Sequence, residues 1–160
     1  MLLQGVTPTL PRDRRIGASQ IQFIHRAATA NRPVQKHNVA TGRVAIATPE
    51  TTILDMIESA DLAAGLGNVG NLVGELALEG LIDDGALTDA ASGYPTAVGQ
   101  RASWLIDHMA GMVGASVELD PLAESVAARD YTLLDPRSPA DGPRDTPWRV
   151  VVHTDVGHDL

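Results

Sequence analysis

The sequence predicts an α+β fold in which a small antiparallel sheet packs with a bundle of four to five helices. Two short segments before Pro49 alternate larger apolar residues with small or polar ones, as half-buried strands do. Several later segments repeat apolar residues at helical spacing, and two more strand-like segments close the chain. Because strands, helices and strands follow one another in blocks, this order favours α+β over a parallel α/β sheet.

The first part of the chain is predicted to be irregular and then to form strands. Residues 1–18 are predicted to form an irregular lead, in which Pro8, Pro11 and Gly17 interrupt any pair of helices. A strand is predicted at residues 20–26 and a second at residues 43–47. Turn signals at residues 31–33 and 41–42 separate them and indicate a sheet of two or three strands.

The second strand leads directly into a helix with a well-defined start. Thr48 can cap this helix and Pro49 can be its first residue, where the missing amide hydrogen has no helical partner to lose. Glu50 places a negative charge in the positive first turn. Ile53, Leu54 and Ile57 recur at the spacing of one buried face.

Four later segments are predicted to be helical. The helix at residues 68–82 is apolar over much of its surface and is therefore expected to be central. A short helix at residues 86–91 precedes the cleanest amphipathic pattern of the chain, at residues 98–113. The last helix is expected at residues 121–129, because an Asp-Pro pair can cap and begin it.

The chain is predicted to close with a pair of strands at residues 131–134 and 148–152. Their connection, residues 135–147, is rich in Pro, Arg, Asp and Gly and is expected to be mobile. The domain organisation that follows is a single α+β domain over residues 19–152 and a flexible tail over residues 153–160.

Composition excludes several classes of protein. The chain has no cysteine, so it can form neither disulfides nor thiolate metal sites. No segment reaches the roughly 18 uninterrupted apolar residues of a membrane span, and the start does not resemble a signal peptide. We therefore expect a cytoplasmic protein with no membrane partner.

The net charge of −8 is unevenly distributed. Residues 1–43 contain seven basic residues and one acid, whereas the remainder contains five basic residues and nineteen acids. A basic segment on an acidic body is a candidate contact surface for nucleic acid or for an acidic partner, although solvated arginines are the simpler interpretation. The candidate residues are Arg12, Arg14, Arg15, Arg26, Arg32, Lys36 and Arg43.

Three motifs could indicate chemistry, and none is expected to do so. Residues 65–70 match Gly-x-Gly-x-x-Gly, but a dinucleotide site requires a preceding strand, so we expect these glycines to let helices pack closely. The terminal His153-Thr-Asp-Val-Gly-His-Asp has metal-ligating atoms but lies at a chain end. Asp55 and Glu58 are expected on the solvent face of their helix. The sequence therefore predicts no catalytic residue, no metal, no cofactor and no small-molecule substrate.

One arrangement of motifs extends over roughly residues 8–152 and resembles a known family, the C-terminal domain of the AbiEi antitoxins of type IV toxin–antitoxin systems. The family pattern is a strand followed by Thr-Pro-Glu, then Thr-Leu-Leu-Asp or similar, then a Gly-rich stretch. The residues that carry it here are Ala47, Thr48, Pro49, Glu50, Thr52, Ile53, Leu54 and Asp55, followed by Gly65, Leu66 and Asn68. The segments Tyr131–Pro136 and Trp148–Val152 also resemble the end of many members.

The resemblance implies a non-enzymatic antitoxin that neutralises a cognate nucleotidyltransferase-like toxin. Thr48, Pro49, Glu50, Leu54 and Asp55 would then be structural residues of the family motif. Full-length members begin with a winged helix-turn-helix, and no such helix pair fits before Gln20. We therefore expect this chain to lack the DNA-reading module, through truncation, a misplaced start or a lineage that works without it. The alternative is a nucleic-acid-binding transcriptional regulator that uses the basic segment.

Overall fold

The computed structural model describes residues 14–17, 19–21, 32–138 and 141–157. The chain divides into two compact units, residues 1–31 and 32–160. In the first unit, strands β1 (Arg14–Ile16) and β2 (Ser19–Ile21) pair antiparallel. Strand β1 replaces irregular chain expected there, because Gly17 at φ 61° adopts the left-handed conformation that a two-residue hairpin turn needs. The rest of the strand predicted at 20–26 lies outside the described residues.

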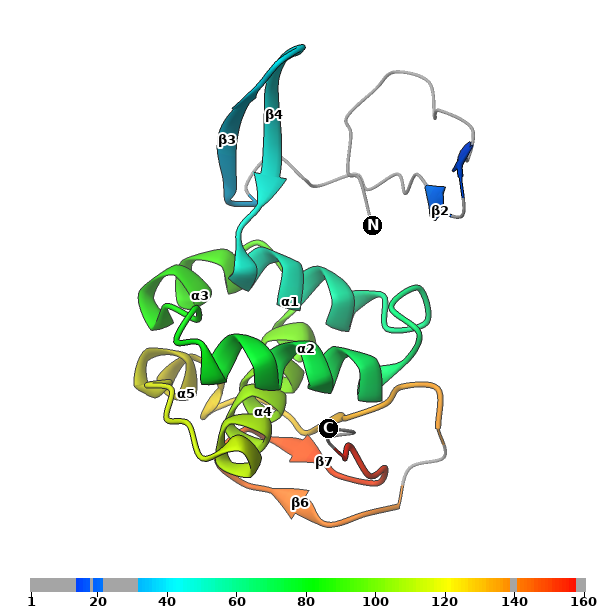
Figure 1. Cartoon of the computed structure of the whole chain (residues 1–160). Helices are drawn as coiled ribbons and strands as arrows, with labels where there is room; N and C mark the ends of the chain where they lie inside the picture. Colours follow the sequence, from blue (N-terminus) through cyan, green and yellow to red (C-terminus); the bar gives the residue numbers. More distant parts are fainter. Residues whose placement is uncertain (1–13, 18, 22–31, 139–140, 158–160) are drawn as a thin grey trace. The chain divides into compact units, whose positions relative to one another are not determined.

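The second unit begins with a hairpin of strands β3 (Val34–Val39) and β4 (Gly42–Ala47). Strand β4 confirms the strand predicted at residues 43–47, but its antiparallel partner is β3, where no strand was predicted. Every residue of β3 is exposed, so the hairpin has no buried face from which alternation could be recognised. Figure 1 shows this hairpin standing away from the helices and β4 leading into the first of them.

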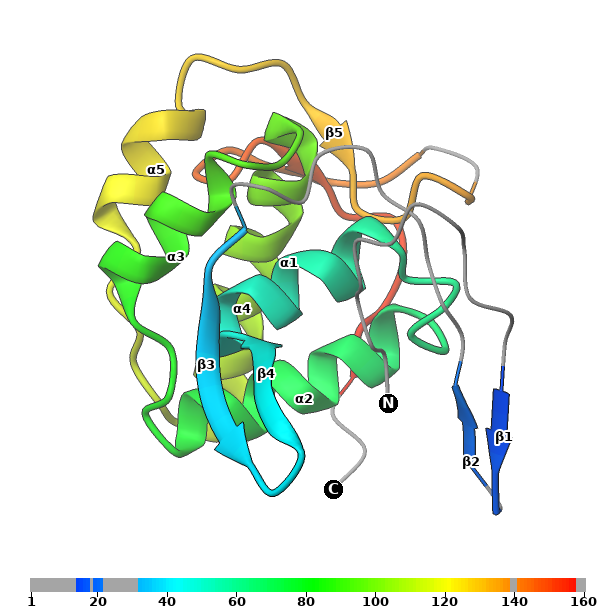
Figure 2. The same ribbon diagram turned by 90° about the horizontal axis from the view of Figure 1, so that it is seen from above.

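In the part of the chain that the structure describes, five helices follow and form the bundle that the sequence predicts, so the fold class is α+β as expected. They are α1 (Pro49–Glu58), α2 (Leu66–Leu78), α3 (Asp84–Ala91), α4 (Thr96–Val113) and α5 (Asp120–Val126). Helix α4 is the central one, since it packs against each of the other four (Figure 2). No helix in the described part of the chain has both the length and the apolar character needed to cross a membrane.

Helix boundaries differ from the prediction where capping decides them. Helix α2 ends at Leu78 instead of continuing to residue 82. Asp83 does not belong to that helix but begins the next one, because its side chain accepts a hydrogen bond from Ala86 N at 2.7 Å. Helix α5 is capped by Leu119, without a side-chain hydrogen bond, instead of by Asp120.

A three-stranded sheet closes the chain, with strand order β5 (Thr132–Leu133), β7 (Val150–Val151), β6 (Arg144–Asp145). The two predicted closing strands pair as expected, and they are parallel. Strand β6 lies in the connection that was expected to be mobile, and it pairs antiparallel with β7.

The described part of the C-terminal tail is packed, which corrects the prediction of a flexible tail from residue 153. Val156 is only 1% exposed and belongs to the hydrophobic core. Its carbonyl lies 3.2 Å from Nε2 of His108 in α4. A Cβ added at Gly70 would lie 2.9 Å from Val156 Cγ1, so the missing side chain at Gly70 is what allows this close approach to α2.

Candidate interaction surface

The seven basic residues predicted as contacts are not equivalent in the structure. Arg12 and Arg26 lie outside the described residues, and only the backbone of Arg14 is described, in β1. Arg15 is exposed in the same strand. The remaining three belong to the second unit, where one is buried and two are exposed.

Arg32 is the buried one, which corrects its assignment to an exposed contact surface. Its guanidinium donates to the carboxylate of Asp55 through Nη1 and to Glu58 Oε2 through Nη2 at 2.9 Å. Its Cζ lies 4.0 Å from the centre of the Tyr94 ring, and the Tyr94 hydroxyl donates to Asp55 at 2.7 Å. We call these four residues the Arg32 cluster.

The Arg32 cluster also corrects the expected position of the two acids. Asp55 is buried and Glu58 is half-buried, whereas both were expected on the solvent face of α1. A buried carboxylate requires a partner, and Arg32 supplies one planar guanidinium to both acids one helical turn apart. These groups therefore hold the start of the second unit to α1.

The residues of the family motif all have structural contacts in α1. Thr48 Oγ1 accepts from Thr51 N at 3.2 Å and caps the helix that Pro49 begins. Glu50 is buried and accepts from Asp83 N at 3.1 Å, and Leu54 is fully buried in the core. Asp55 binds the Arg32 guanidinium.

Lys36 and Arg43 are exposed on the β3–β4 hairpin and share one of its faces. The register pairs Lys36 with Ala45 and Asn38 with Arg43, so these side chains lie on the same side of the two strands. Arg43 Nε donates to Asn38 Oδ1 at 3.2 Å. Residues 34–47 contain no acid, so this basic face has no carboxylate of its own to neutralise it.

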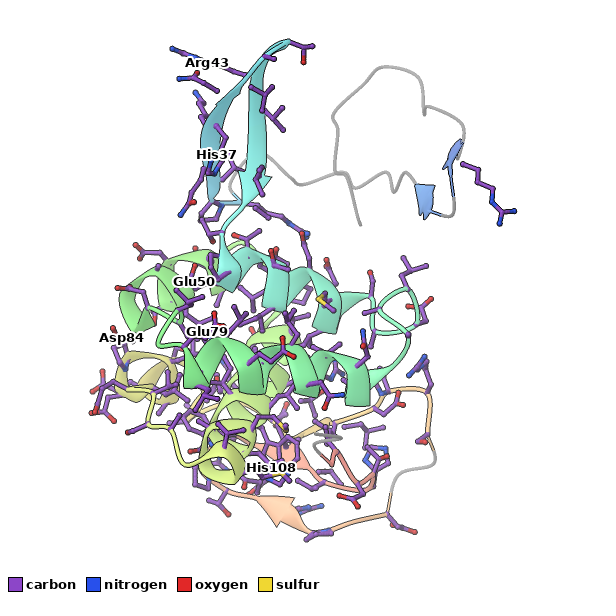
Figure 3. All side chains as sticks on the ribbon, in the orientation of Figure 1. His37, Arg43, Glu50, Glu79, Asp84 and His108 are labelled. Atoms are coloured by element: carbon purple, nitrogen blue, oxygen red, sulfur yellow. The ribbon has the colours of Figure 1, made fainter. Side chains whose placement is uncertain are left out.

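The opposite face of the hairpin is largely apolar. Val39, Val44 and Ile46 lie there together with Gln35 and His37. Ile46 is 51% exposed, and Figure 3 labels His37 on the hairpin, apart from the helices. A two-stranded hairpin alone in water is marginally stable and has unpaired groups at its edges. Such a hairpin is suited to contact another macromolecule.

Contacts with α1 hold both ends of this hairpin. Pro33 O, just before β3, accepts from Thr51 Oγ1 at 3.0 Å, and the adjacent Arg32 belongs to the cluster described above. At the other end, β4 is followed at once by the capped start of α1. The base of the hairpin is therefore fixed, while its strands are open to a partner.

The glycine motif and the terminal histidine have packing contacts. Gly65 at φ 96° precedes α2 and follows a run of turns, not the strand that a dinucleotide site requires. His153 places its ring nitrogens 3.0 Å from Val151 O and 3.0 Å from Asp135 O. His158 and Asp159 lie outside the described residues. Among the residues that the structure describes, no group of three His, Cys, Asp or Glu is placed to hold a metal ion.

Comparison with protein-family models gives a match. A family model described as the AbiEi antitoxin C-terminal domain matches residues 6–108, which is more than half of the chain. The match includes the β3–β4 hairpin, the Arg32 cluster and the capped start of α1. No curated protein and no solved structure matches the chain significantly.

Proposed function

The chain belongs to the AbiEi antitoxin family, and on this premise we propose that it neutralises a cognate toxin of the nucleotidyltransferase type without catalysing a reaction. Neutralisation would take place in the cytoplasm, where a nucleotidyltransferase finds its substrates. The family match supports the antitoxin role, and the β3–β4 hairpin supports a role in gripping a macromolecule.

The hairpin is the observation that carries this proposal. It exposes Val39 and Ile46 on one face, and Lys36 and Arg43 on the other, on a base held by α1. Exposed aliphatic side chains on a fixed hairpin provide apolar area for binding, and the unneutralised cations favour an acidic partner. The hairpin lies within the region matched to the family.

The polar groups of α1 support a non-catalytic role. Asp55 and Glu58, the only pair of carboxylates that the sequence spacing placed together on α1, bind Arg32 in a mostly buried cluster. Oδ1 of Asp55 accepts from both the Arg32 guanidinium and the Tyr94 hydroxyl, and these contacts support a structural role for this carboxylate.

Co-expression with the toxin gene tests the proposal. The gene of a candidate nucleotidyltransferase-like toxin is induced in a bacterial host, with or without this chain, and growth is followed. We expect growth arrest without the chain and growth with it. Continued arrest at equal levels of folded antitoxin would contradict the proposed function.

A matched pair of variants tests the role of the hairpin. Ile46→Asp places a negative charge on the apolar face of the hairpin. Met112→Asp places the same charge on α4, and the two original side chains are equally exposed, at 51% each. Neither substitution buries a charge, so both variants should fold. We expect the Ile46→Asp variant to fail to restore growth of cells that express the toxin, and the Met112→Asp variant to restore it as the wild type does. If both variants rescue growth equally, the hairpin is not the contact surface.

A second candidate function, nucleic-acid binding by a transcriptional regulator, is favoured by the basic face of the hairpin. Lys36 and Arg43 lie on one face with no acid in either strand, as expected of a surface that tracks phosphates. Arg15 is a further exposed cation, in the first unit.

Duplex binding at low salt tests this second function. We expect retardation of a labelled duplex at about 50 mM salt that weakens steeply at about 200 mM, because phosphate contacts release counterions. The double variant Lys36→Gln/Arg43→Gln should bind more weakly with a shallower dependence on salt. Absence of retardation at about 50 mM salt excludes this function, since electrostatic binding is strongest there.

A further inference from the structure

A second surface lies at the closing sheet, outside the residues matched to the family. Tyr131 is flanked by two arginines, with Arg144 Cζ 5.1 Å and Arg149 Cζ 5.3 Å from the centre of its ring. Its hydroxyl lies 3.4 Å from Thr146 Oγ1. Two guanidinium groups are thereby gathered beside one aromatic ring at the surface.

Arg149 also lines an open concavity of about 400 Å³, and Arg144 lies on the same Tyr131 ring as Arg149. Helix α5 and the β6–β7 connection form its walls, and the wall area is mostly apolar. Glu124 is the one acid among the lining residues, and it is exposed. The lining residues are Ala123, Glu124, Ala127, Thr146, Pro147 and Arg149. We call the concavity and the two arginines the arginine cup.

Arg149 has a backbone conformation that is uncommon for a residue with a side chain. Its φ is 56°, in the left-handed region. Its Nε donates to Ala127 O at 3.0 Å, and its carbonyl accepts from Gln100 Nε2 at 3.2 Å and from Thr132 N at 2.9 Å. Several contacts therefore hold Arg149 at the edge of the concavity, and such conformations cluster at binding sites.

The arginine cup carries positive charge that the described structure does not neutralise. No ion pair between described residues involves Arg144 or Arg149, although residues 44–160 contain nineteen acids and five basic residues. The neighbouring Asp145 accepts from Trp148 N at 3.1 Å. An apolar concavity beside two such arginines fits a segment that combines carboxylates with aliphatic side chains.

The chain itself exposes such a segment between α2 and α3. Leu78 is 64% exposed and Leu81 is 48% exposed, and acids follow or alternate with them at Glu79, Asp83 and Asp84. We call residues 78–84 the acidic leucine turn. Figure 3 labels Glu79 and Asp84 at one end of the helical bundle.

The turn and the cup lie on neighbouring elements. The turn leads into α3, and α3 packs against α5, which forms one wall of the cup; the two helices lie side by side in Figures 1 and 2. A two-fold axis beside these helices would let each copy place its turn in the cup of the other, because an isologous interface uses the same two patches on both subunits.

We propose that the arginine cup binds the acidic leucine turn of a second copy of this chain, and that the chain forms a two-fold dimer through two such contacts. The aliphatic side chains of the turn fill the apolar concavity, while its carboxylates pair with Arg144 and Arg149. This proposal does not depend on the proposed function, because the dimer forms without toxin.

Sedimentation equilibrium of the full chain tests the proposal. Between about 1 and 300 μM protein, a range that covers small interfaces, we expect a monomer–dimer equilibrium. The dissociation constant should rise at least about tenfold from about 50 mM to about 500 mM salt, because the contacts combine charge pairs. A monomer at all these concentrations at low salt would overturn the proposal.

Charge reversal identifies the surfaces. Arg144→Glu and Glu79→Arg change exposed side chains, and the second places a cation at a helix C-terminus, where it is favourable. Each variant alone should raise the dissociation constant at least about tenfold, since like charges then oppose each other. An equimolar mixture should dimerise again, because a heterodimer contains one wild-type contact and one fully reversed contact.

Arg43→Glu is the matched control, because it makes the same change of charge on the β3–β4 hairpin. Its dissociation constant should stay within about twofold of wild type, as expected for a charge outside the interface. A dimer that Arg144→Glu leaves intact, or a mixture that stays monomeric, contradicts the proposal. The proposal is also contradicted if the chain is monomeric and its arginine cup is needed to bind the toxin, because the cup would then bind another protein and not a second copy of this chain.

Discussion

Arg32 joins the start of the second unit to α1, and its removal should be costly. Its side chain is 6% exposed and contacts Asp55 and Glu58. Removing one partner of a buried ion pair typically costs about 3–5 kcal/mol, because the remaining charge stays in a poorly solvated site. We expect Arg32→Ala to lower the free energy of unfolding by about 3 kcal/mol, measured by urea denaturation.

Two further variants show whether burial is the cause. Arg43→Ala removes an exposed arginine with no ion pair described for it, so its effect should stay within about 0.5 kcal/mol. Arg32→Lys keeps the charge but cannot reach two carboxylates with one planar group, so it should fall between the other two. Equal effects of Arg32→Ala and Arg43→Ala would show that the cluster does not stabilise the fold.

The half-buried Asp135 and the exposed Arg137 form a pair whose effect depends on pH. Hydrogen bonds from the Arg137 side chain and backbone, together with its charge, lower the pKa of Asp135. A carboxyl whose pKa is lowered on folding stabilises the folded protein when the pH is above the pKa of the unfolded state. This stabilisation disappears as the pH falls through the pKa of the folded state. We expect Arg137→Gln to raise the pKa of Asp135, as measured by carbon NMR of the carboxyl group.

The same variant should be less stable than wild type at neutral pH only. As the pH falls through the lowered pKa of Asp135, the carboxyl becomes protonated in both proteins, so the difference in urea midpoint should vanish there. A difference that persists unchanged in acid would mean that Arg137 stabilises the fold through packing and not through Asp135.

Sequence could identify exposed charges of the hairpin but not the buried one. Lys36 and Arg43 are exposed, as a basic segment predicts. Arg32 is buried because two acids that lie 23 and 26 residues further along the chain meet it in space. A local sequence pattern cannot show a contact between residues so far apart in the chain. For the same reason, Asp55 was wrongly predicted to lie on the solvent face of α1.

At the scale of elements, what was predicted correctly is what local chemistry determines. The start of α1 follows from Thr48 as cap and Pro49 as first residue, both read from adjacent positions. The closing sheet was predicted only in part, because strands of two residues are too short to show alternation. Strand β6 forms through its pairing with β7, which is a tertiary contact.

Two glycines of α2 should respond in opposite ways to alanine. At Gly70 a Cβ would lie 2.9 Å from Val156 Cγ1 and 3.4 Å from Met109 Sδ, so neighbours must move. At Gly67 nothing lies within 4 Å. Overpacking costs about 1–3 kcal/mol, whereas Gly to Ala in a helix gains up to about 1 kcal/mol. We expect thermal unfolding to show Gly70→Ala destabilised by about 1 kcal/mol and Gly67→Ala slightly stabilised.

This pair also tests the structural role given to the glycine motif. If Gly70 serves close packing, Gly70→Ala should loosen the C-terminal segment, and amide exchange near Val156 should become faster. A stabilised Gly70→Ala variant would show that the approach of Val156 to α2 is not tight.

At the scale of the whole molecule, the second unit combines a basic, exposed hairpin with an acidic helical body. The body holds the core, while the hairpin contributes little buried surface. The family region ends in α4, so the arginine cup and the closing sheet lie beyond it. Sequence indicated the basic character of the hairpin but could not indicate the cup, whose residues come from two separate segments, 123–127 and 144–149.

This division predicts that the helical body folds without the hairpin. Replacing residues 35–46 by a short Gly-Ser linker removes exposed strands but keeps Arg32, Pro33 and the capped start of α1. Because little apolar area is lost, the free energy of unfolding should change by less than about 1 kcal/mol, while rescue from the toxin is abolished. Calorimetry and the co-expression assay measure the two effects.

Deleting Val156 and the residues after it is the control: it removes a core side chain and should lower stability by about 2 kcal/mol or more. A large loss of stability on replacing the hairpin would mean that the strands are part of the body, and that their exposure does not mark a surface reserved for a partner.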